Sequence, residues 1–243
     1  MDKKNAMIVG GKKLRKVVQE LTPYIKVGTK LTDIDSKATR LIRENGGSPS
    51  FSTVPGYSWS TCLSVNEVVV HGVPSNYLLK EGDVLKLDIG IVYGGFHVDY
   101  SDTLTIGRID NRVERFLKVG NSTLRHALTL VKDKVRIGIV SAYIQENIES
   151  AGYKVIHELT GHAVGEELHM EPYIPGVLVG SIDRTPCFRS GYAYAIEVIY
   201  SFHDNHVVLA NKDGWSLRTK SFSQSACFEN TVYVDEEKSI LLV

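Results

Sequence analysis

Two aspartates, Asp88 and Asp99, lie in one stretch of alternating apolar residues that is interrupted by Gly94-Gly95. A glycine pair between two such runs is typical of a β-hairpin with a two-residue turn. With that turn, Asp99 lies opposite Gly90, which shares a face with Asp88 because side chains alternate along a strand. The two carboxylates are then diagonal neighbours, with Cβ atoms roughly 7–8 Å apart or less.

The charges on this predicted hairpin indicate a bound cation. Lys86 is the one basic residue on the carboxylate face, so two carboxylates at this separation repel each other unless a cation lies between them. A divalent metal ion is the simplest explanation. The opposite face is the expected core row and carries Leu85, Leu87, Ile89 and Ile91.

The second half of the chain supplies further ligand types. Glu197 and Glu229 each lie within an apolar run, and His162 lies in Thr160–Gly165, which we expect to form a glycine-punctuated turn where neighbouring chains approach closely. Buried glutamates are rare unless they are paired or bound to metal. A salt bridge would explain one of them. Two glutamates, an aspartate pair and a histidine instead favour two hard or borderline divalent ions that share bridging oxygens.

Periodicity and end signals predict the elements that position these residues. Helices are expected from about Lys3 to Ile25, from Leu31 to Glu44, from Arg112 to Val131 with Asn111 as N-cap, and from Val140 to Ala151. Strands are expected in the hairpin and in the apolar runs Tyr192–Tyr200, His206–Ala210 and Cys227–Val234. The order helices, strands, helices, strands predicts an α+β protein. We expect two similar halves that form one domain, residues 1–243, with a site between their sheets.

Composition excludes several classes of function. Lys plus Arg equals Asp plus Glu, at 28 each, so no global field favours nucleic acid, a membrane surface or an acidic partner. The three widely spaced cysteines are typical of reduced thiols rather than of a disulfide framework. Neither a signal peptide nor a transmembrane run is found. These features predict a cytoplasmic protein.

Several motifs together resemble one family. His71-Gly72-Val73-Pro74, the Asp88-to-Asp99 spacing, Gly161-His162, Ile196-Glu197 and Phe228-Glu229 are similar to methionine aminopeptidases over nearly the whole chain. The ordered set is specific, although a single piece such as Gly-His is weak. The resemblance implies the pita-bread fold, a pseudo-twofold pair of α/β halves whose antiparallel sheets enclose a dinuclear metal site. Only 31 residues lie between Glu197 and Glu229, which leaves no room for the insertion of type 2 enzymes and favours type 1.

The resemblance also implies a metal arrangement. Asp99 and Glu229 would bridge two divalent ions, Asp88 would chelate one of them, and His162 and Glu197 would complete the other. A water between the ions would be the nucleophile, and Glu197 would accept its proton and pass it to the leaving amine. The ions could be Co, Mn, Fe or Zn, because such sites accept all four.

Residues around the metals are implied in the same way. His71 and His169 would hydrogen-bond the scissile amide and the tetrahedral intermediate, although the residues alone favour an ordinary surface histidine at His169. The methionine pocket would be lined by Tyr57, Cys62, Leu168 and Trp215. The chain departs from the family pattern at Val54, Ala163, Leu168, Val198 and Asn230, of which Val54 and Leu168 could reshape the pocket. None removes a ligand. The remaining histidines are expected to be structural or solvated: His97, His126, His157, His203 and His206.

The implied activity is removal of the initiator methionine from nascent polypeptide N-termini, with a preference for a small second residue. A monomer is expected, and a transient ribosome contact stays open. One alternative is a proline-specific aminopeptidase on the same fold, but its extra histidine upstream of Gly161-His162 is matched only by His157, in an uncertain register. A second alternative is a non-catalytic binding protein that lost its metals, although all five ligands are present.

Overall fold

The computed structural model describes all 243 residues. Each half begins with two helices and continues into strands. The first half contains α1 (Lys3–Leu21), α2 (Leu31–Glu44), β1 (Ser48–Pro49), β2 (Thr61–Val65), β3 (Val68–Val70), β4 (Val84–Tyr93) and β5 (Phe96–Thr105). The second contains α3 (Asn111–Leu130), α4 (Ile137–Ser150), β6 (Lys154–Val155), β7 (Thr160–Val164), β8 (Met170–Pro175), β9 (Ala193–Ser201), β10 (Val207–Leu209), β11 (Leu217–Thr219), β12 (Ser225–Val234) and β13 (Ser239–Leu241).

The two halves share one antiparallel sheet. Its main order is β1-β4-β5-β12-β9-β7-β8, and β5 of the first half pairs with β12 of the second through Ser101 opposite Glu229. The antiparallel sheets expected for the two halves are therefore continuous at their common edge. A small second sheet, β10-β11-β3, joins segments from both halves.

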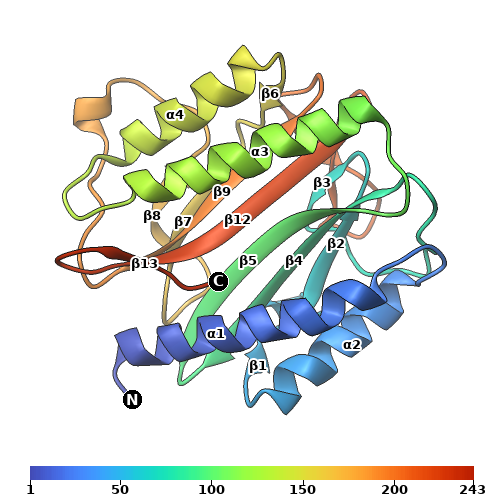
Figure 1. Cartoon of the computed structure of the whole chain (residues 1–243), viewed down its shortest axis with the longest axis horizontal. Helices are drawn as coiled ribbons and strands as arrows, with labels where there is room; N and C mark the ends of the chain where they lie inside the picture. Colours follow the sequence, from blue (N-terminus) through green and yellow to red (C-terminus); the bar gives the residue numbers. More distant parts are fainter.

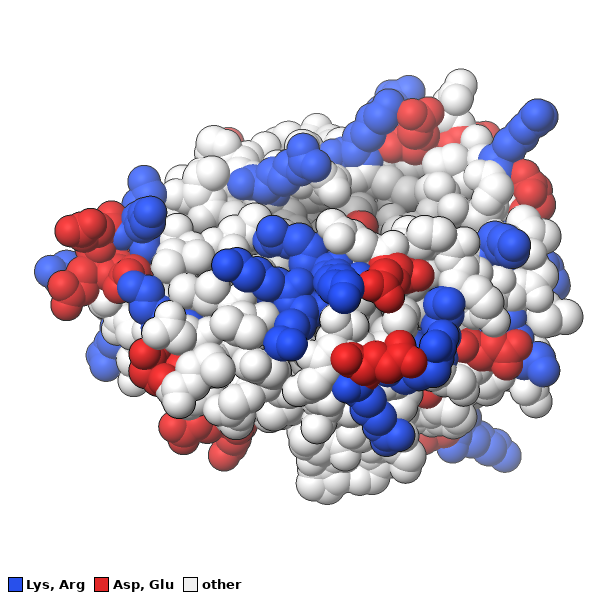
Figure 2. Space-filling view, turned by 60° about the horizontal axis from the view of Figure 1, so that its bottom comes forward, with Lys and Arg blue, Asp and Glu red and all other residues white.

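All four helices cover one face of the large sheet (Figure 1), α1 and α2 over the strands of the first half and α3 and α4 over those of the second. The expected core row, with Leu85 and Ile91 at its ends, is fully buried in the cluster that includes α1 and α2. A second buried cluster forms beneath α3 and α4. None of the helices has the length and apolarity that crossing a bilayer requires. Charged side chains of both signs lie on the face shown in Figure 2. Lys16 and Glu20 form one exposed ion pair along α1.

The hairpin register is as predicted. Tyr93 pairs with Phe96 and Gly90 with Asp99, and the turn glycines have φ of 60° and 86°. Positive φ at both central residues matches the right-handed twist of the flanking strands. The turn therefore fixes which face carries the two aspartates.

Three predicted helix boundaries were wrong by a few residues. Helix α1 ends at Leu21 rather than at about Ile25, because a separate turn containing Pro23 follows it. The N-cap of α3 is Asp110, not Asn111, because the Asp110 carboxylate accepts a hydrogen bond from the Arg112 amide at 2.6 Å. Helix α4 begins at Ile137 rather than Val140, since Gly138 in its first turn donates its amide to Thr185 Oγ1 at 3.0 Å. A tertiary contact thus replaces the local capping signal.

The Gly161-His162 segment is a strand, not the predicted turn. It forms β7, which pairs with β9 through His162 and Ala195, with an irregularity between His162 and Ala163 where β7 meets β8. The expected close approach is present, because a Cβ atom on Gly161 would lie 2.4 Å from the Ala195 carbonyl oxygen. Glycine is needed here for strand contact rather than for turning.

Gly161→Ala is expected to lower the free energy of unfolding by roughly 1–3 kcal/mol, because the new methyl group must push β7 away from β9. Urea denaturation of both proteins measures this change. Gly165→Ala is the matched control, since its Cβ would first meet the Met170 sulfur at 3.4 Å, an ordinary contact. Equal losses in both variants would contradict the close-approach argument.

Candidate metal site

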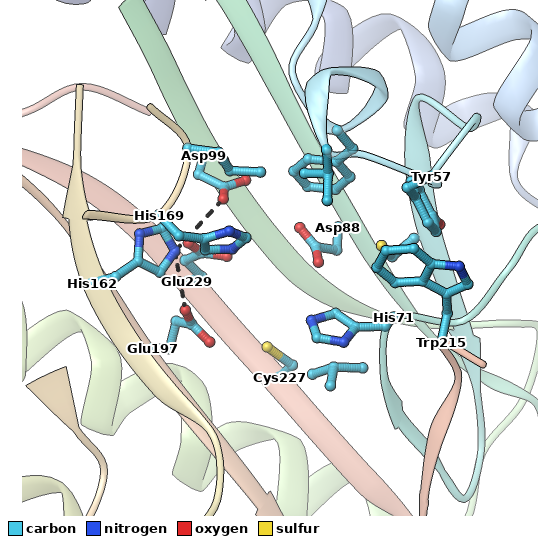
Figure 3. A pocket seen from close by; sticks show the side chains of 15 residues that line it. Tyr57, His71, Asp88, Asp99, His162, His169, Glu197, Trp215, Cys227 and Glu229 are labelled. Carbon is cyan, nitrogen blue, oxygen red and sulfur yellow. Dashed lines mark ion pairs between the residues drawn. The ribbon is translucent and has the colours of Figure 1, made fainter. Parts of the chain in front are cut away.

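The five predicted ligands converge from five strands of the large sheet. Asp88 comes from β4, Asp99 from β5, Glu229 from β12, Glu197 from β9 and His162 from β7. They project from the face opposite the helices into one cavity (Figure 3). Because neighbouring strands lie about 4.8 Å apart, residues on adjacent strands and the same face come within reach of a shared ion.

Register brings the carboxylates together. Glu229 lies directly opposite Glu197, and one side-chain donor atom from each of Asp99, His162 and Glu229 lies within 4.8 Å of the others. The His162 Nε2 atom is 3.6 Å from a Glu197 oxygen and 3.9 Å from an Asp99 oxygen. Asp88 lines the same cavity one strand further along.

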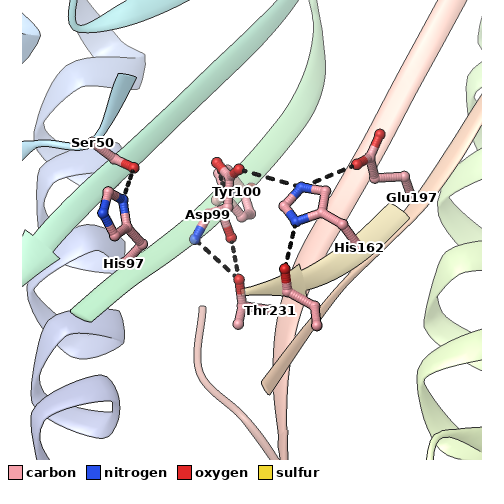
Figure 4. Close-up of polar contacts among 8 residues, drawn as sticks. Ser50, His97, Asp99, Tyr100, His162, Glu197 and Thr231 are labelled. Atoms are coloured by element: carbon pink, nitrogen blue, oxygen red, sulfur yellow. Dashed lines mark hydrogen bonds and ion pairs between the residues drawn. The ribbon is translucent and has the colours of Figure 1, made fainter. Parts of the chain in front are cut away.

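Hydrogen bonds orient the His162 ring and fix the backbone of Asp99 (Figure 4). His162 Nδ1 lies 3.0 Å from the Ala163 carbonyl oxygen, which fixes Nδ1 as the protonated nitrogen and leaves the Nε2 lone pair facing the carboxylates. Thr231 Oγ1 accepts from the Asp99 amide at 3.0 Å and donates to the Asp99 carbonyl at 2.7 Å. Thr231 thus ties β12 to β5 beside the site. Sequence reasoning missed it, although its spacing of two from Glu229 places it on the same face.

The cavity has no permanently charged basic side chain to balance its carboxylates. None of its fifteen lining residues is Lys or Arg. Lys86, which shares the face of Asp88, donates its ammonium to the Asn66 carbonyl instead. The buried oxygens Asp88 Oδ1 and Glu229 Oε1 have no hydrogen-bond partner. Orphaned carboxylate oxygens beside an imidazole lone pair are a donor set that fits a divalent cation.

Without a cation, burial and mutual repulsion change the ionisation of the site. Burial raises the pKa of Asp99 to about 7. Burial, and then the charges of the other carboxylates, raise the pKa of Asp88, Glu197 and Glu229 well above their usual range. Burial and then His169 lower the pKa of His162 to about 4, so this imidazole is neutral. Protons therefore occupy part of the carboxylate cluster when no metal does.

Two further histidines border the cavity. His71 follows β3 with a left-handed φ of 56°, a conformation rare outside glycine. Burial and then His169 lower its pKa to about 4. His169 lies in the β7–β8 loop near the surface, with its ring centroid 4.6 Å from that of His162. The structure thus brings both histidines beside the carboxylate cluster.

An apolar lobe completes the cavity. Tyr57, Cys62 and Leu168 form a small buried cluster, and Trp215 packs edge-on to Tyr57 with ring centroids 5.2 Å apart. The cavity measures about 110 Å³, enough for one side chain rather than a large ligand. Sequence reasoning missed three lining residues that carry no motif: Phe51, Val70 and Cys227.

The remaining histidines lie outside the cavity. His97 is buried, with Nδ1 2.7 Å from Ser50 Oγ, and the other four are exposed: His126, His157, His203 and His206. Val198 and Asn230 also lie away from the cavity, because each follows a glutamate in its strand and points to the helix face. Of the five departures from the family pattern, only Val54 and Leu168 line the cavity.

Comparison with known proteins gives a consistent result. The sequence matches the model of metallopeptidase family M24 over residues 5–236. It is 34% identical to methionine aminopeptidase 1 of Bacillus subtilis over 219 residues, which is 90% of this chain and 87% of that protein. It is 30% identical to methionine aminopeptidase of Escherichia coli over 232 residues, 95% of this chain and 87% of that protein.

Solved structures agree with these sequence matches. The methionine aminopeptidase of Thermotoga maritima superimposes with a TM-score of 0.94 at 34% identity, covering 99% of this chain and 96% of that one. The prolidase of Pyrococcus furiosus gives 0.79 at 19% identity, covering 99% of this chain and 63% of that one, a likeness of fold alone. These matches confirm the pita-bread fold and the resemblance read from the motifs.

Metal binding to the metal-free protein is expected to release protons at about pH 6.5, because Asp99, with a pKa of about 7, is largely protonated there and must ionise to bind a cation. Affinity should rise with pH through that pKa. Titration calorimetry with Mn²⁺ in buffers of different ionisation enthalpy counts the protons. Asp99→Asn should bind less metal and release fewer protons. A binding heat that does not depend on the buffer would contradict proton occupancy of the cluster.

Proposed function

The chain belongs to metallopeptidase family M24, and we propose that it is a methionine aminopeptidase, which removes the N-terminal methionine of polypeptides with a small second residue. The observation that carries this proposal is one small cavity that joins the carboxylate–histidine cluster to an apolar lobe. The identity of 30–34% to methionine aminopeptidases over most of the chain supports it. The likeness to prolidases is one of fold only.

Divalent metal binding follows from the family and from the buried Asp, His and Glu cluster. We propose that two ions would be held here by Asp88, Asp99, His162, Glu197 and Glu229 together. When bound, the ions act as Lewis acids that polarise the scissile carbonyl and lower the pKa of water. The neutral His162, with its Nε2 lone pair facing the carboxylates, supports the proposed ligand set.

The remaining chemistry belongs to side chains of this chain. Glu197 accepts the proton of the attacking water and passes it to the leaving amine. With a pKa of about 4, His71 is neutral at about pH 7 and keeps one N–H to donate to the substrate amide. His169, on the loop at the cavity edge, is placed to donate to the oxygen that gains charge as the carbonyl is attacked.

The apolar lobe selects the methionine side chain. Tyr57 donates its hydroxyl to the Thr61 carbonyl at 2.8 Å, so that its ring presents an apolar surface to the lobe. Trp215 packs against that ring, and the unbranched thioether of methionine packs well on aromatic edges. Cys62 and Leu168 supply the rest of the lining.

Residues 1–243 act in this proposal as one catalytic domain, since both halves contribute ligands to a single cavity. The enzyme acts as a monomer in the cytoplasm, where nascent polypeptide N-termini appear, and a transient ribosome contact would bring it to them. The complete cavity within one chain supports the monomer. The equal numbers of basic and acidic residues favour no nucleic-acid partner.

With a defined metal added back to metal-free protein, Met-Ala-Ser should be hydrolysed at its first bond, whereas Leu- or Lys-initiated peptides should be much poorer substrates. The apolar lobe offers no charged partner for a lysine ammonium, so burying that side chain there is costly. Chromatography of the released amino acid measures each rate. Faster cleavage of Xaa-Pro peptides would transfer the proposal to a proline-specific enzyme, and no cleavage with metal bound would favour a binding protein.

His169→Ala should lower kcat by about 10²–10³-fold if His169 acts as one donor to the developing oxyanion. KM should change much less, because that interaction forms mainly in the transition state. Bound metal should stay the same. His203→Ala, at an exposed histidine outside the cavity, is the control. Metal loss in parallel with activity would make His169 a ligand, and normal kcat would return it to an ordinary surface residue.

A further inference from the structure

A buried lysine lies next to the site without contributing to it. Lys86 is only 1% exposed, on the same face of β4 as Asp88, two residues away. Its Nζ donates to the Asn66 carbonyl oxygen at 2.6 Å, and no carboxylate lies within ion-pair distance. An ammonium buried without a counter-charge is costly. Burial lowers the pKa of this amine to about 7, and the Asn66 carbonyl oxygen is the acceptor that holds it in place.

Several hydrogen-bond donors converge on the Asn66 carbonyl oxygen. Besides Lys86, the Asn66 carbonyl accepts from Ser225 Oγ at 2.9 Å, Gln224 Nε2 at 3.1 Å and the Ser225 amide at 3.3 Å. The carbonyl of Val68 lies 3.2 Å from the same Ser225 hydroxyl. A carbonyl oxygen has two lone pairs for these four donors. Lys86 makes the shortest of the four bonds, so it is the main donor at the junction of β3, β4 and β12.

The junction controls the backbone that carries His71. Asn66, with a left-handed φ of 53°, turns the chain from β2 into β3, and His71 follows β3 directly. Beyond His71, the Gly72 amide donates to Ser64 Oγ at 3.0 Å, and Ser216 Oγ lies 3.4 Å from the His71 carbonyl. The short strand is thus fixed at both ends. From it the His71 imidazole points into the cavity, near Asp88 and Cys227 (Figure 3).

We propose that Lys86 is a positioning residue: its ammonium holds the Asn66 turn, and through β3 it sets the place of the His71 imidazole in the cavity. The role of His71 in turnover rests on the proposed function, whereas the placement of its ring does not. A displacement of about 1 Å at a reacting group can cost about 10²-fold in rate. Lys86 can therefore matter to catalysis without touching substrate or metal.

Lys86→Met removes the charge and keeps an unbranched side chain. It should lower kcat about tenfold or more, change KM by less than about twofold, and leave bound metal per chain unchanged. In a His71→Ala background the same change should have almost no further effect on kcat, because coupled residues are not additive. Lys12→Met, at an exposed lysine of α1, should leave kcat unchanged in both backgrounds.

Ser225→Ala removes one neutral donor from the same oxygen and serves as the milder variant if Lys86→Met does not fold. It should also lower kcat, by a smaller factor than Lys86→Met does. In the His71→Ala background it should likewise have almost no further effect on kcat. The imidazole NMR signals of His71, identified by their loss in His71→Ala, should move in Lys86→Met and in Ser225→Ala, whether or not the protein cleaves Met-Ala-Ser.

The possible outcomes separate the two proposals. If the wild-type protein has no peptidase activity but the His71 signals move in Lys86→Met, the proposed function is wrong and the positioning role stands. Unmoved signals, or additive losses of kcat, would overturn the positioning role and leave the peptidase intact. Loss of metal in parallel with kcat would show that Lys86 supports Asp88 instead of His71, which also overturns it.

Discussion

Four carboxylates that are buried or partly buried on one face of a sheet repel one another, and the architecture around the site responds to that repulsion. Burial removes the water that would screen their charges, and no Lys or Arg enters the cavity. The charge can be reduced in only two ways, by protons or by metal cations. The raised pKa of each carboxylate corresponds to the first way, in which protons reduce the charge. The oxygens of Asp88 and Glu229 that have no hydrogen-bond partner indicate the second way, in which metal cations reduce the charge.

The joined sheet is what makes such a cluster possible. Pairing of β5 with β12 sets Ser101 opposite Glu229, and pairing of β12 with β9 sets Glu229 opposite Glu197. Ligands on adjacent strands inherit the fixed spacing of the sheet, so the site needs no flexible loop to assemble it. Contacts such as Thr231 on the Asp99 backbone hold neighbouring strands in register at the site. The helices on the other face supply the buried area that stabilises this arrangement.

The sequence predicted the relative positions of site residues that are close along the chain, but not of those that are far apart along it. Asp88 and Asp99 were placed correctly because a two-residue turn fixes the register of its hairpin. The Glu197–Glu229 pairing could not be derived, since a long connection leaves strand order and register open. The expected turn at His162 failed for a different reason. The glycine before it serves a tight strand contact, and glycine signals turns and close approaches alike. Phe51 and Val70 carry no chemical signal at all, and only the fold reveals that they line the cavity.

Alternation along the strands also decides where this chain can diverge without losing chemistry. Val198 and Asn230 follow ligands directly, yet their side chains point to the opposite face, where Val198 packs beneath α3 and α4. Substitutions there alter core packing and leave the charges of the cavity unchanged. Val54 and Leu168 lie on segments outside the strands and line the cavity itself. The proposed ligands on rigid strands and the proposed pocket residues on loops can therefore change independently. For that reason, divergence of this chain from its relatives should appear in the choice of the cleaved residue before it appears in the hydrolytic step.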